Sequence, residues 1–381
     1  MNILATGELY FHIDKAEDFA GFVPINVEKG HYFWLLTRAS ITSDEPLFYE
    51  YIEQISNYFF SRAKVLQNAV YQFLVLIHKD LSADLYINNF TVMIEIMAKR
   101  NLETFQPVTS NDIADIRRLK FSNIKILETD KVIYCFKVGW KFGLFFDLDR
   151  AEKLDSDKMA LDLGTLYRKL SFQHVYEVLE NETKFEEMLK DGWFPFIEII
   201  GNEYKDLSSA YQDRFDFDNR IKKLVSNFGS TRIEKITKKW WGKQIFNDKK
   251  TILEAGTSAF LQDGNDGYVN CIKTLLSEAE GIIRIQYFSE TGKGKNVTVQ
   301  DLLIYLIEKG KRKTGSEYSL LLPFPFLQYL KDVIYPNFDI EKGLVDLSRH
   351  TSSHGVAKAE TYTHIRALQA ILIIDQIYFY I

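Results

Sequence analysis

The residue types best suited to acid–base chemistry gather near the end of the chain. Three of the seven histidines, His350, His354 and His364, lie within residues 346–364, and Arg349 directly precedes the first of them. Histidine can accept or donate a proton near neutral pH. Arginine stays charged and can donate two parallel hydrogen bonds to phosphate oxygens. These residue types therefore suit reactions at phosphate, where a proton moves while negative charge develops.

The pattern Arg349, His350, three small polar residues, His354 and Gly355 resembles the motif of the HEPN superfamily. That family places an Arg, a polar residue, a short spacer and a His at the start of a bundle helix. The upstream segment LLSEAEGIIRIQYF and the closing apolar segment also resemble the family, and the resemblance covers roughly residues 246–381.

The resemblance implies a metal-independent endoribonuclease that uses the 2′-hydroxyl of RNA as its nucleophile and needs no cofactor. Arg349 would hold the phosphate, His354 would move the proton, and His350 would orient the pair or the substrate. The products would be a 2′,3′-cyclic phosphate and a 5′-hydroxyl. Such domains often act as toxins or as antiviral defence effectors, so this role is expected only by analogy.

The spacing of the motif sets a geometric condition. On a regular helix, residues five apart differ by about 140° in azimuth, so Arg349 and His354 would not share one face. Either a helix begins at or near Arg349, or a partner subunit completes the site. Because HEPN ribonucleases resemble the second arrangement, we expect a homodimer through the C-terminal bundle.

Three other interpretations of the motif stay open. Arg349 and His354 could be a structural pair, with His354 capping a helix and Arg349 bridging to an acid such as Asp346. The domain could be a noncatalytic interaction module that keeps only the HEPN-like fold. Asp346, His350 and His354 are spaced by four residues and could bind a divalent metal in a hydrolase.

Two basic segments are further candidates for RNA binding. Lys238, Lys239 and Trp240 lie in the run KITKKWWGK, which could hold phosphates and stack bases, or could be a helix face anchored by its tryptophans. Lys311, Arg312 and Lys313 are expected in a basic surface turn. Residues 231–381 carry 20 Lys and Arg against 17 Asp and Glu, a net of +3, which leaves −8 for residues 1–230. The C-terminal part is therefore the expected RNA-binding part.

The helices and strands expected around these residues indicate an α+β protein. Residues 1–160 are expected to form a mixed α/β domain, with strands in the first forty residues and again over 124–149. Between them, Ser43 or Asp44 caps a predicted helix whose apolar stripe runs from Phe48 to Phe73. Residues 161–245 are expected to be a helical connector.

Residues 246–381 predict an all-helical, HEPN-like bundle. One helix carries an apolar stripe over 269–287 and an expected Glu280–Arg284 pair. The next begins at a capping box of Thr298 and Asp301 and is expected to end at Gly310. A third helix covers about 326–334. A final apolar helix begins near Thr363 and carries Asp375, which is expected to be buried and paired.

Composition indicates a well-folded chain: 46% of the 381 residues are hydrophobic and 26% are charged. Both cysteines, Cys135 and Cys271, lie in apolar runs, which suits the reducing cytoplasm. No signal peptide is recognised, and no stretch of 18 apolar residues predicts a membrane span. We therefore expect a cytoplasmic protein that does not enter a membrane.

Overall fold

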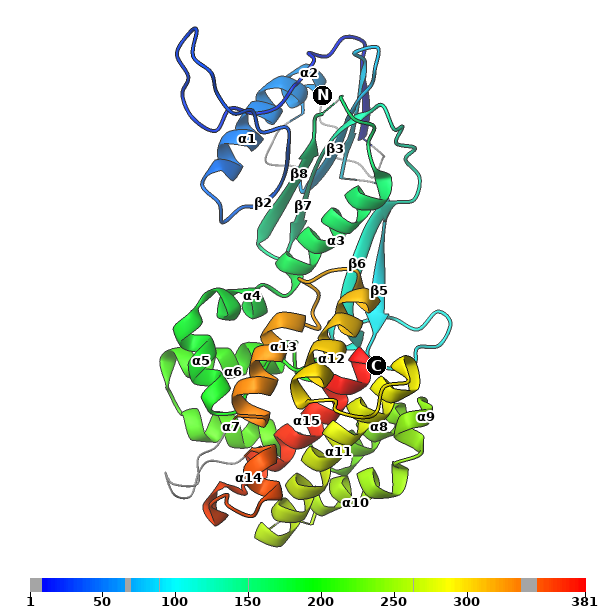
Figure 1. Ribbon diagram of the computed structural model, residues 1–381. Helices are drawn as coiled ribbons and strands as arrows, with labels where there is room; N and C mark the ends of the chain where they lie inside the picture. Colours follow the sequence, from blue (N-terminus) through cyan, green and yellow to red (C-terminus); the bar gives the residue numbers. More distant parts are fainter. Residues whose placement is uncertain (1–8, 66–69, 89, 150, 263, 337–347) are drawn as a thin grey trace. The chain divides into compact units, whose positions relative to one another are not determined.

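The computed structural model describes residues 9–65, 70–88, 90–149, 151–262, 264–336 and 348–381 (Figure 1). The chain forms two compact units: residues 1–96 with 116–173, and residues 97–115 with 174–381. The first contains an antiparallel sheet and the second is mainly helical, which confirms the α+β class. The chain passes between the units within β5 (Val92–Ala98) and β6 (Ile113–Phe121), which pair as a two-stranded ribbon, and again between Gln173 and His174.

The first unit is built on a six-stranded antiparallel sheet. Its order is β1 (Leu9–Ile13), β4 (Ala83–Ile87), β3 (Gln72–Ile77), β7 (Lys131–Val138), β8 (Lys141–Asp147) and β2 (Arg38–Thr42). Every neighbouring pair is antiparallel. Gly139, with a φ of +60°, turns the β7–β8 hairpin.

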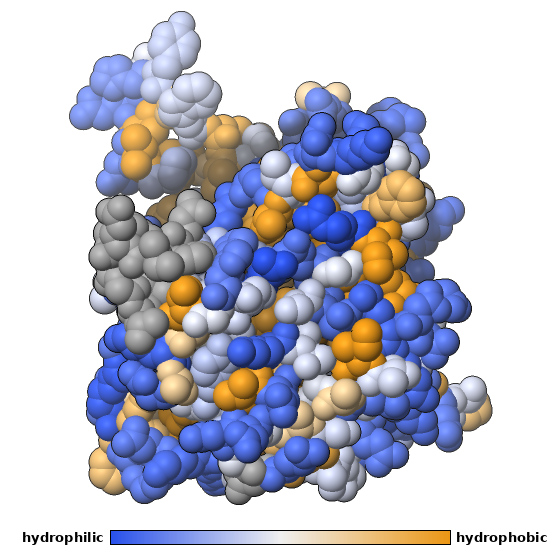
Figure 2. Space-filling view, turned by 60° about the horizontal axis from the view of Figure 1, so that its bottom comes forward, coloured by the Kyte–Doolittle hydropathy of each residue, from blue (hydrophilic) through white to orange (hydrophobic). Residues whose placement is uncertain are grey.

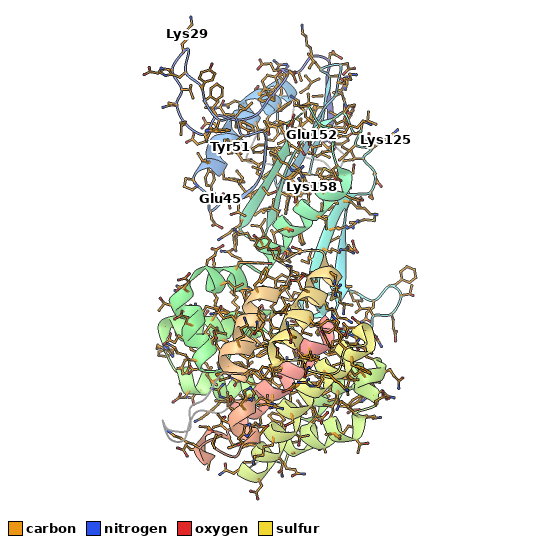
Figure 3. All side chains as sticks on the ribbon, viewed as in Figure 1. Lys29, Glu45, Tyr51, Lys125, Glu152 and Lys158 are labelled. Atoms are coloured by element: carbon orange, nitrogen blue, oxygen red, sulfur yellow. The ribbon has the colours of Figure 1, made fainter. Side chains whose placement is uncertain are left out.

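Both faces of this sheet are covered. Along β3, Phe73, Val75 and Ile77 pack into the core that contains α1 (Leu47–Ile55), whereas Leu74 and Leu76 pack into the core that contains α3 (Ser156–Ser171). This alternation places α1 and α3 on opposite faces, because successive side chains of a strand point to opposite sides. Figure 3 labels Tyr51 on α1 and Lys158 on α3.

Several predicted boundaries in this unit were wrong. The helix expected to reach Phe73 continues from α1 through a π turn (Ser56–Phe60) and α2 (Ser61–Ala63), and Lys64 ends it with a φ of +54°. Phe73 lies in β3 instead, since its apolar run pairs with two neighbouring strands. Residues 124–128 form no strand, and the described residues 21–27 form only an isolated bridge between Phe22 and Leu36.

The second unit holds the remaining helices. In chain order they are α4 (Gln173–Glu180), α5 (Glu182–Lys190), α6 (Asn202–Asp213), α7 (Phe217–Ser226), α8 (Ser230–Trp240), α9 (Gln244–Asn247), α10 (Lys250–Phe260), α11 (Asn265–Thr291), α12 (Val299–Thr314), α13 (Pro323–Tyr329) with a π turn (Leu330–Ile334), α14 (Arg349–Ser353) and α15 (His364–Tyr380). The expected connector over 161–245 is thus divided: α3 belongs to the first unit and the later helices to the second.

The core of the second unit forms around α15, which packs against α10, α11 and α12 (Figure 1). Nearly every residue of α15 from Ala367 onward is buried, so this helix is apolar all round. Thr363 caps it by accepting a hydrogen bond from the backbone N–H of Arg366. The helix predicted from Thr363 to the end of the chain is therefore confirmed.

The prediction for α12 was correct at its start and wrong at its end. Thr298 and Asp301 form the expected capping box. Gly310 does not end the helix but lies inside it, where a Cβ atom would come within 2.5 Å of the Tyr380 ring. The helix ends at Gly315, which has a φ of +69°. Gly310 therefore serves close packing against α15 rather than termination.

Candidate active site

The predicted motif forms a short helix, α14, of five residues. Ser348 caps it in a reciprocal pair with Thr351, and both residues are buried. Arg349 is the first helical residue and His354 is the C-cap. Gly355 then leaves the helix with a φ of +73°, a conformation that favours glycine. A helix does begin at Arg349, but His354 keeps helical dihedral angles (φ −87°, ψ −3°), so the separation of about 140° in azimuth between Arg349 and His354 remains.

Arg349 is held by an acid on α11. Its Nη2 lies 3.0 Å from Oε2 of Glu280, and Nη2 of Arg284 lies 2.9 Å from Oε1 of the same carboxylate. The carboxylate of Glu280 lies between two guanidinium groups. Glu280 is only 9% exposed, so this site is largely shielded from water. The expected pair of Glu280 and Arg284 is confirmed. The acid that contacts Arg349 is Glu280, while Asp346 lies outside the described residues.

His350 lies at the wall of a hollow in the second unit. The hollow has a volume of about 770 Å³ and is also lined by Lys331, Asp332 and Tyr335. The rings of His350 and Tyr335 lie 5.9 Å apart in an edge-to-face arrangement. Burial lowers the pKa of His350, and the positive charge of Arg349 lowers it further. The imidazole of His350 is therefore neutral at neutral pH, with one ring nitrogen able to accept a proton.

His354 is exposed at the end of α14, where a substrate can reach it. It contributes to the lowered pKa of His350, so the two imidazoles are electrostatically coupled. The turn thus carries a cation, Arg349, and two imidazoles, and the charges of Arg349 and His354 both act on His350. This set can bind an anion and move protons, which are the two requirements of phosphodiester cleavage.

The structural interpretation of the motif also finds support in this geometry. His354 does cap α14, through its backbone N–H, which donates to the carbonyl of His350. Arg349 does bridge to an acid, Glu280. These contacts orient both side chains and are compatible with either role. RNA cleavage by variants of Arg349 and His354 distinguishes a positioned catalytic pair from a structural pair.

The metal interpretation depended on Asp346, which lies outside the described residues, together with His350 and His354. Within the part of the chain that the structure describes, no three His, Cys, Asp or Glu side chains gather as a metal site would require. The metal-hydrolase alternative therefore gains no support from the described residues.

The first basic segment is mostly engaged inside the second unit. Trp240 is fully buried, and its Nε1 donates a hydrogen bond to Asp375 at 2.8 Å. Lys239 lies 2.8 Å from the same carboxylate and 3.5 Å from Glu198. Asp375 is thus buried and paired, as predicted. The burial of Trp240 favours the anchoring alternative over base stacking, and only Lys238 of the three candidates is exposed.

The second basic segment forms the last turn of α12 rather than a separate turn. Lys311 pairs with Glu308 at 3.2 Å, and Lys313 donates to the backbone carbonyl of Phe379 at 2.7 Å. Arg312 is exposed. Of these candidates, Arg312 is the side chain best placed to meet a phosphate backbone.

Glu280 is the functional candidate that the sequence did not reveal. Its pairing with Arg284 follows from helical spacing, but its contact with Arg349 joins residues far apart in the chain. No local sequence pattern predicts such a contact. An acid on a helix that packs against the motif helix is the feature that could have suggested it.

Comparison with protein-family models, with curated proteins and with solved structures found no match. The resemblance to the HEPN superfamily therefore rests on the motif and its helical surroundings alone. None of the described helices is both long enough and apolar enough to cross a membrane.

Proposed function

We propose that this chain is a metal-independent endoribonuclease of the HEPN type, with Arg349 as the phosphate-binding residue and His354 as the proton-transfer residue. The observation that carries the proposal is the geometry of α14. Arg349 is its first residue and is paired with Glu280, and His354 is its C-cap. His350, with its lowered pKa, lies beside the pair and orients the pair or the substrate.

In the proposed reaction, one imidazole takes the proton of the RNA 2′-hydroxyl. The 2′-oxygen then attacks phosphorus, and the bond from phosphorus to the 5′-oxygen breaks. A protonated imidazole gives its proton to that 5′-oxygen. The products are a 2′,3′-cyclic phosphate and a 5′-hydroxyl, and no water is consumed. The charge of Arg349 stabilises the phosphorane as it forms.

Two proton-transfer groups are required, and a homodimer through the C-terminal bundle supplies them. His354 would act as base and the partner subunit's His354 as acid, or the reverse. Figure 2 shows the end of the second unit, where hydrophobic side chains are scattered among hydrophilic ones. An interface there would be largely polar, which is common for complexes that form reversibly. Sedimentation should give about twice the chain mass of 44.5 kDa.

The biological setting is proposed by analogy. A ribonuclease of this type would act on cellular or viral RNA in the cytoplasm, as a toxin or an antiviral defence effector. Lys238 and Arg312, exposed in the second unit, are the remaining candidates for contacts to the RNA backbone.

The test is cleavage of single-stranded RNA by the full chain in excess EDTA. The variant His354→Ala should lose about 100- to 10,000-fold in rate, the usual contribution of acid–base catalysis. His364→Asn is the matched control, because His364 lies in the same segment but stacks on Tyr268 outside the motif. Equal activity in the wild type and His354→Ala would refute the assignment.

A noncatalytic interaction module is the second candidate. It is favoured by the Arg349–Glu280 pair, because a guanidinium already held by an acid needs no substrate to explain its position. This candidate predicts that the wild type does not cleave RNA, with or without added metal. Activity that appears only with zinc or manganese would instead indicate the metal hydrolase.

A further inference from the structure

The helical unit contains a second hollow, which is lined by none of the motif residues Arg349, His350 and His354. Its volume is about 810 Å³. It lies between the N-termini of α6 and α8 and the two ends of the loop that joins β5 to β6. Its size is in the range of sites that bind small molecules. All of its lining residues belong to one compact unit, so the hollow is complete within that unit.

Lys99 is a buried cation at the wall of this hollow. It directly follows β5 and is only 8% exposed. Its side chain makes no hydrogen bond and no ion pair with any residue that the structure describes. Its strongest charged neighbours include Glu198 and Lys239, which line the same hollow. A largely buried ammonium without a partner is costly, and an anionic ligand in the hollow would compensate it.

The carboxylates of the hollow are already engaged by other cations. Glu203 accepts two hydrogen bonds from the guanidinium of Arg232, at 2.6 and 2.8 Å. Glu198 lies 3.2 Å from the same guanidinium. Asp112 pairs with Arg100 at 2.5 Å. These acids are paired with cations within the protein, which weakens their repulsion of an incoming anion, and Glu198 stabilises the ammonium of Lys99 only through space.

Two helices begin at the hollow without a side-chain cap. The N-cap of α6, a helix of twelve residues, is Gly201, and that of α8, a helix of eleven residues, is Gly229. Their first-turn N–H groups and helix dipoles favour a negative ligand. Ser230 and Thr231 add hydroxyl groups at the start of α8, and a Cβ atom on Gly229 would meet only open space. Lys235, one turn later, adds an exposed cation without a partner among the described residues.

We propose that this hollow binds the phosphate group of a small phosphorylated molecule, such as a nucleotide. The phosphate would lie between the N-termini of α6 and α8 and would pair with Lys99. The volume leaves room for the rest of a mononucleotide beside the phosphate. The proposal uses none of the motif residues, so it stands whether or not the chain cleaves RNA.

Binding should weaken at alkaline pH. Burial lowers the pKa of Lys99 to about 8, an effect that the attraction of Glu198 opposes and the repulsion of Lys239 and Arg232 reinforces. Asp375 faces the same group and raises its pKa. A bound anion stabilises the charged form, so affinity is constant below about pH 8 and falls above it. Sulfate is the suitable probe for this measurement, because its charge does not change in this range.

The experiment is titration calorimetry and thermal unfolding of the full chain with inorganic phosphate, sulfate, AMP and ATP. The decisive variant is Lys99→Met, which keeps the apolar stem and removes the ammonium. It should weaken binding by about tenfold or more. It should also unfold at the same or a higher temperature than the wild type without ligand, since a buried unpaired charge is removed. The matched control is Lys222→Met, an exposed lysine of α7 outside the hollow, which should bind like the wild type.

The outcomes separate the possible ligands. Tighter binding of AMP or ATP than of phosphate supports the proposal with a nucleotide as ligand. Equal binding supports it with free phosphate as the ligand. No binding of any probe to the wild type, or equal binding to Lys99→Met, overturns it. It is also overturned if a short RNA displaces sulfate while mononucleotides do not, because the hollow would then belong to a path for RNA.

Discussion

Replacing Arg349 tests how the motif is positioned as well as what it does. Arg349→Ala leaves Oε2 of Glu280 without the cation now 3.0 Å away, while Arg284 remains 2.9 Å from Oε1. Glu280 is 9% exposed, so water compensates this loss only partly. Removing the ion-pair partner of a largely buried carboxylate costs about 1–3 kcal/mol. A unit of this size loses roughly 2–4 °C in melting temperature per kcal/mol.

The assay is a double-mutant cycle with Arg349→Ala, Glu280→Gln and the double variant. Urea and thermal unfolding measure stability, and RNA cleavage is measured on the same samples. We expect Arg349→Ala to cost less stability in the Glu280→Gln background, with a coupling energy of about 1 kcal/mol. We expect cleavage to be absent in both proteins that lack Arg349.

Two results would refute this reasoning. A coupling energy near zero would show that Arg349 and Glu280 do not interact as the geometry indicates. If the double variant recovers cleavage together with stability, Arg349 has only a structural role and the proposed phosphate contact is wrong.

Two further predictions concern the packing inside each unit. Gly310→Ala should destabilise the protein by about 1–3 kcal/mol, because its Cβ would lie 2.5 Å from the ring of Tyr380. Gly281→Ala, in the middle of α11, is the matched control. Its Cβ would meet the side-chain ends of Lys249 at 3.4 Å and Glu278 at 3.8 Å without a severe clash, so it should be neutral or stabilise by up to about 1 kcal/mol. Equal unfolding temperatures for both variants would contradict the close approach of α12 and α15. Cys135 in the first unit and Cys271 in the second are buried free thiols, and burial raises the pKa of Cys271 to about 12. Neither should react with an aromatic disulfide reagent until its own unit unfolds, and rapid labelling of the native protein would show that the burial is wrong.

The local structure of the motif could be predicted from sequence, but its orientation could not. Residues 348–351 carry a capping pattern, and Gly355 marks a helix end, so a short helix at Arg349 follows from local rules. The contact with Glu280 depends on how α11 packs against α14, which no spacing reveals.

The predictions that failed also depended on contacts between residues far apart in the chain. The stripe from Phe48 to Phe73 matched helical spacing, yet Phe73 belongs to a strand. A short apolar run fits the period of a helix or that of a strand, so its pattern alone does not decide which of the two it forms. Gly310 resembled a helix end locally, yet its small size serves a contact with a helix seventy residues later. The hollow at Lys99 likewise joins a ribbon to helices that follow much later in the chain.

The most direct test of the proposed ribonuclease compares two substrates that differ at one position. A short RNA and the same RNA with a 2′-deoxy nucleotide at the scissile site are incubated with the full chain in excess EDTA. The account predicts cleavage of the first alone, with a product whose cyclic phosphate opens to phosphatase only after acid treatment. Cleavage of the 2′-deoxy substrate, or of neither substrate, would contradict the account.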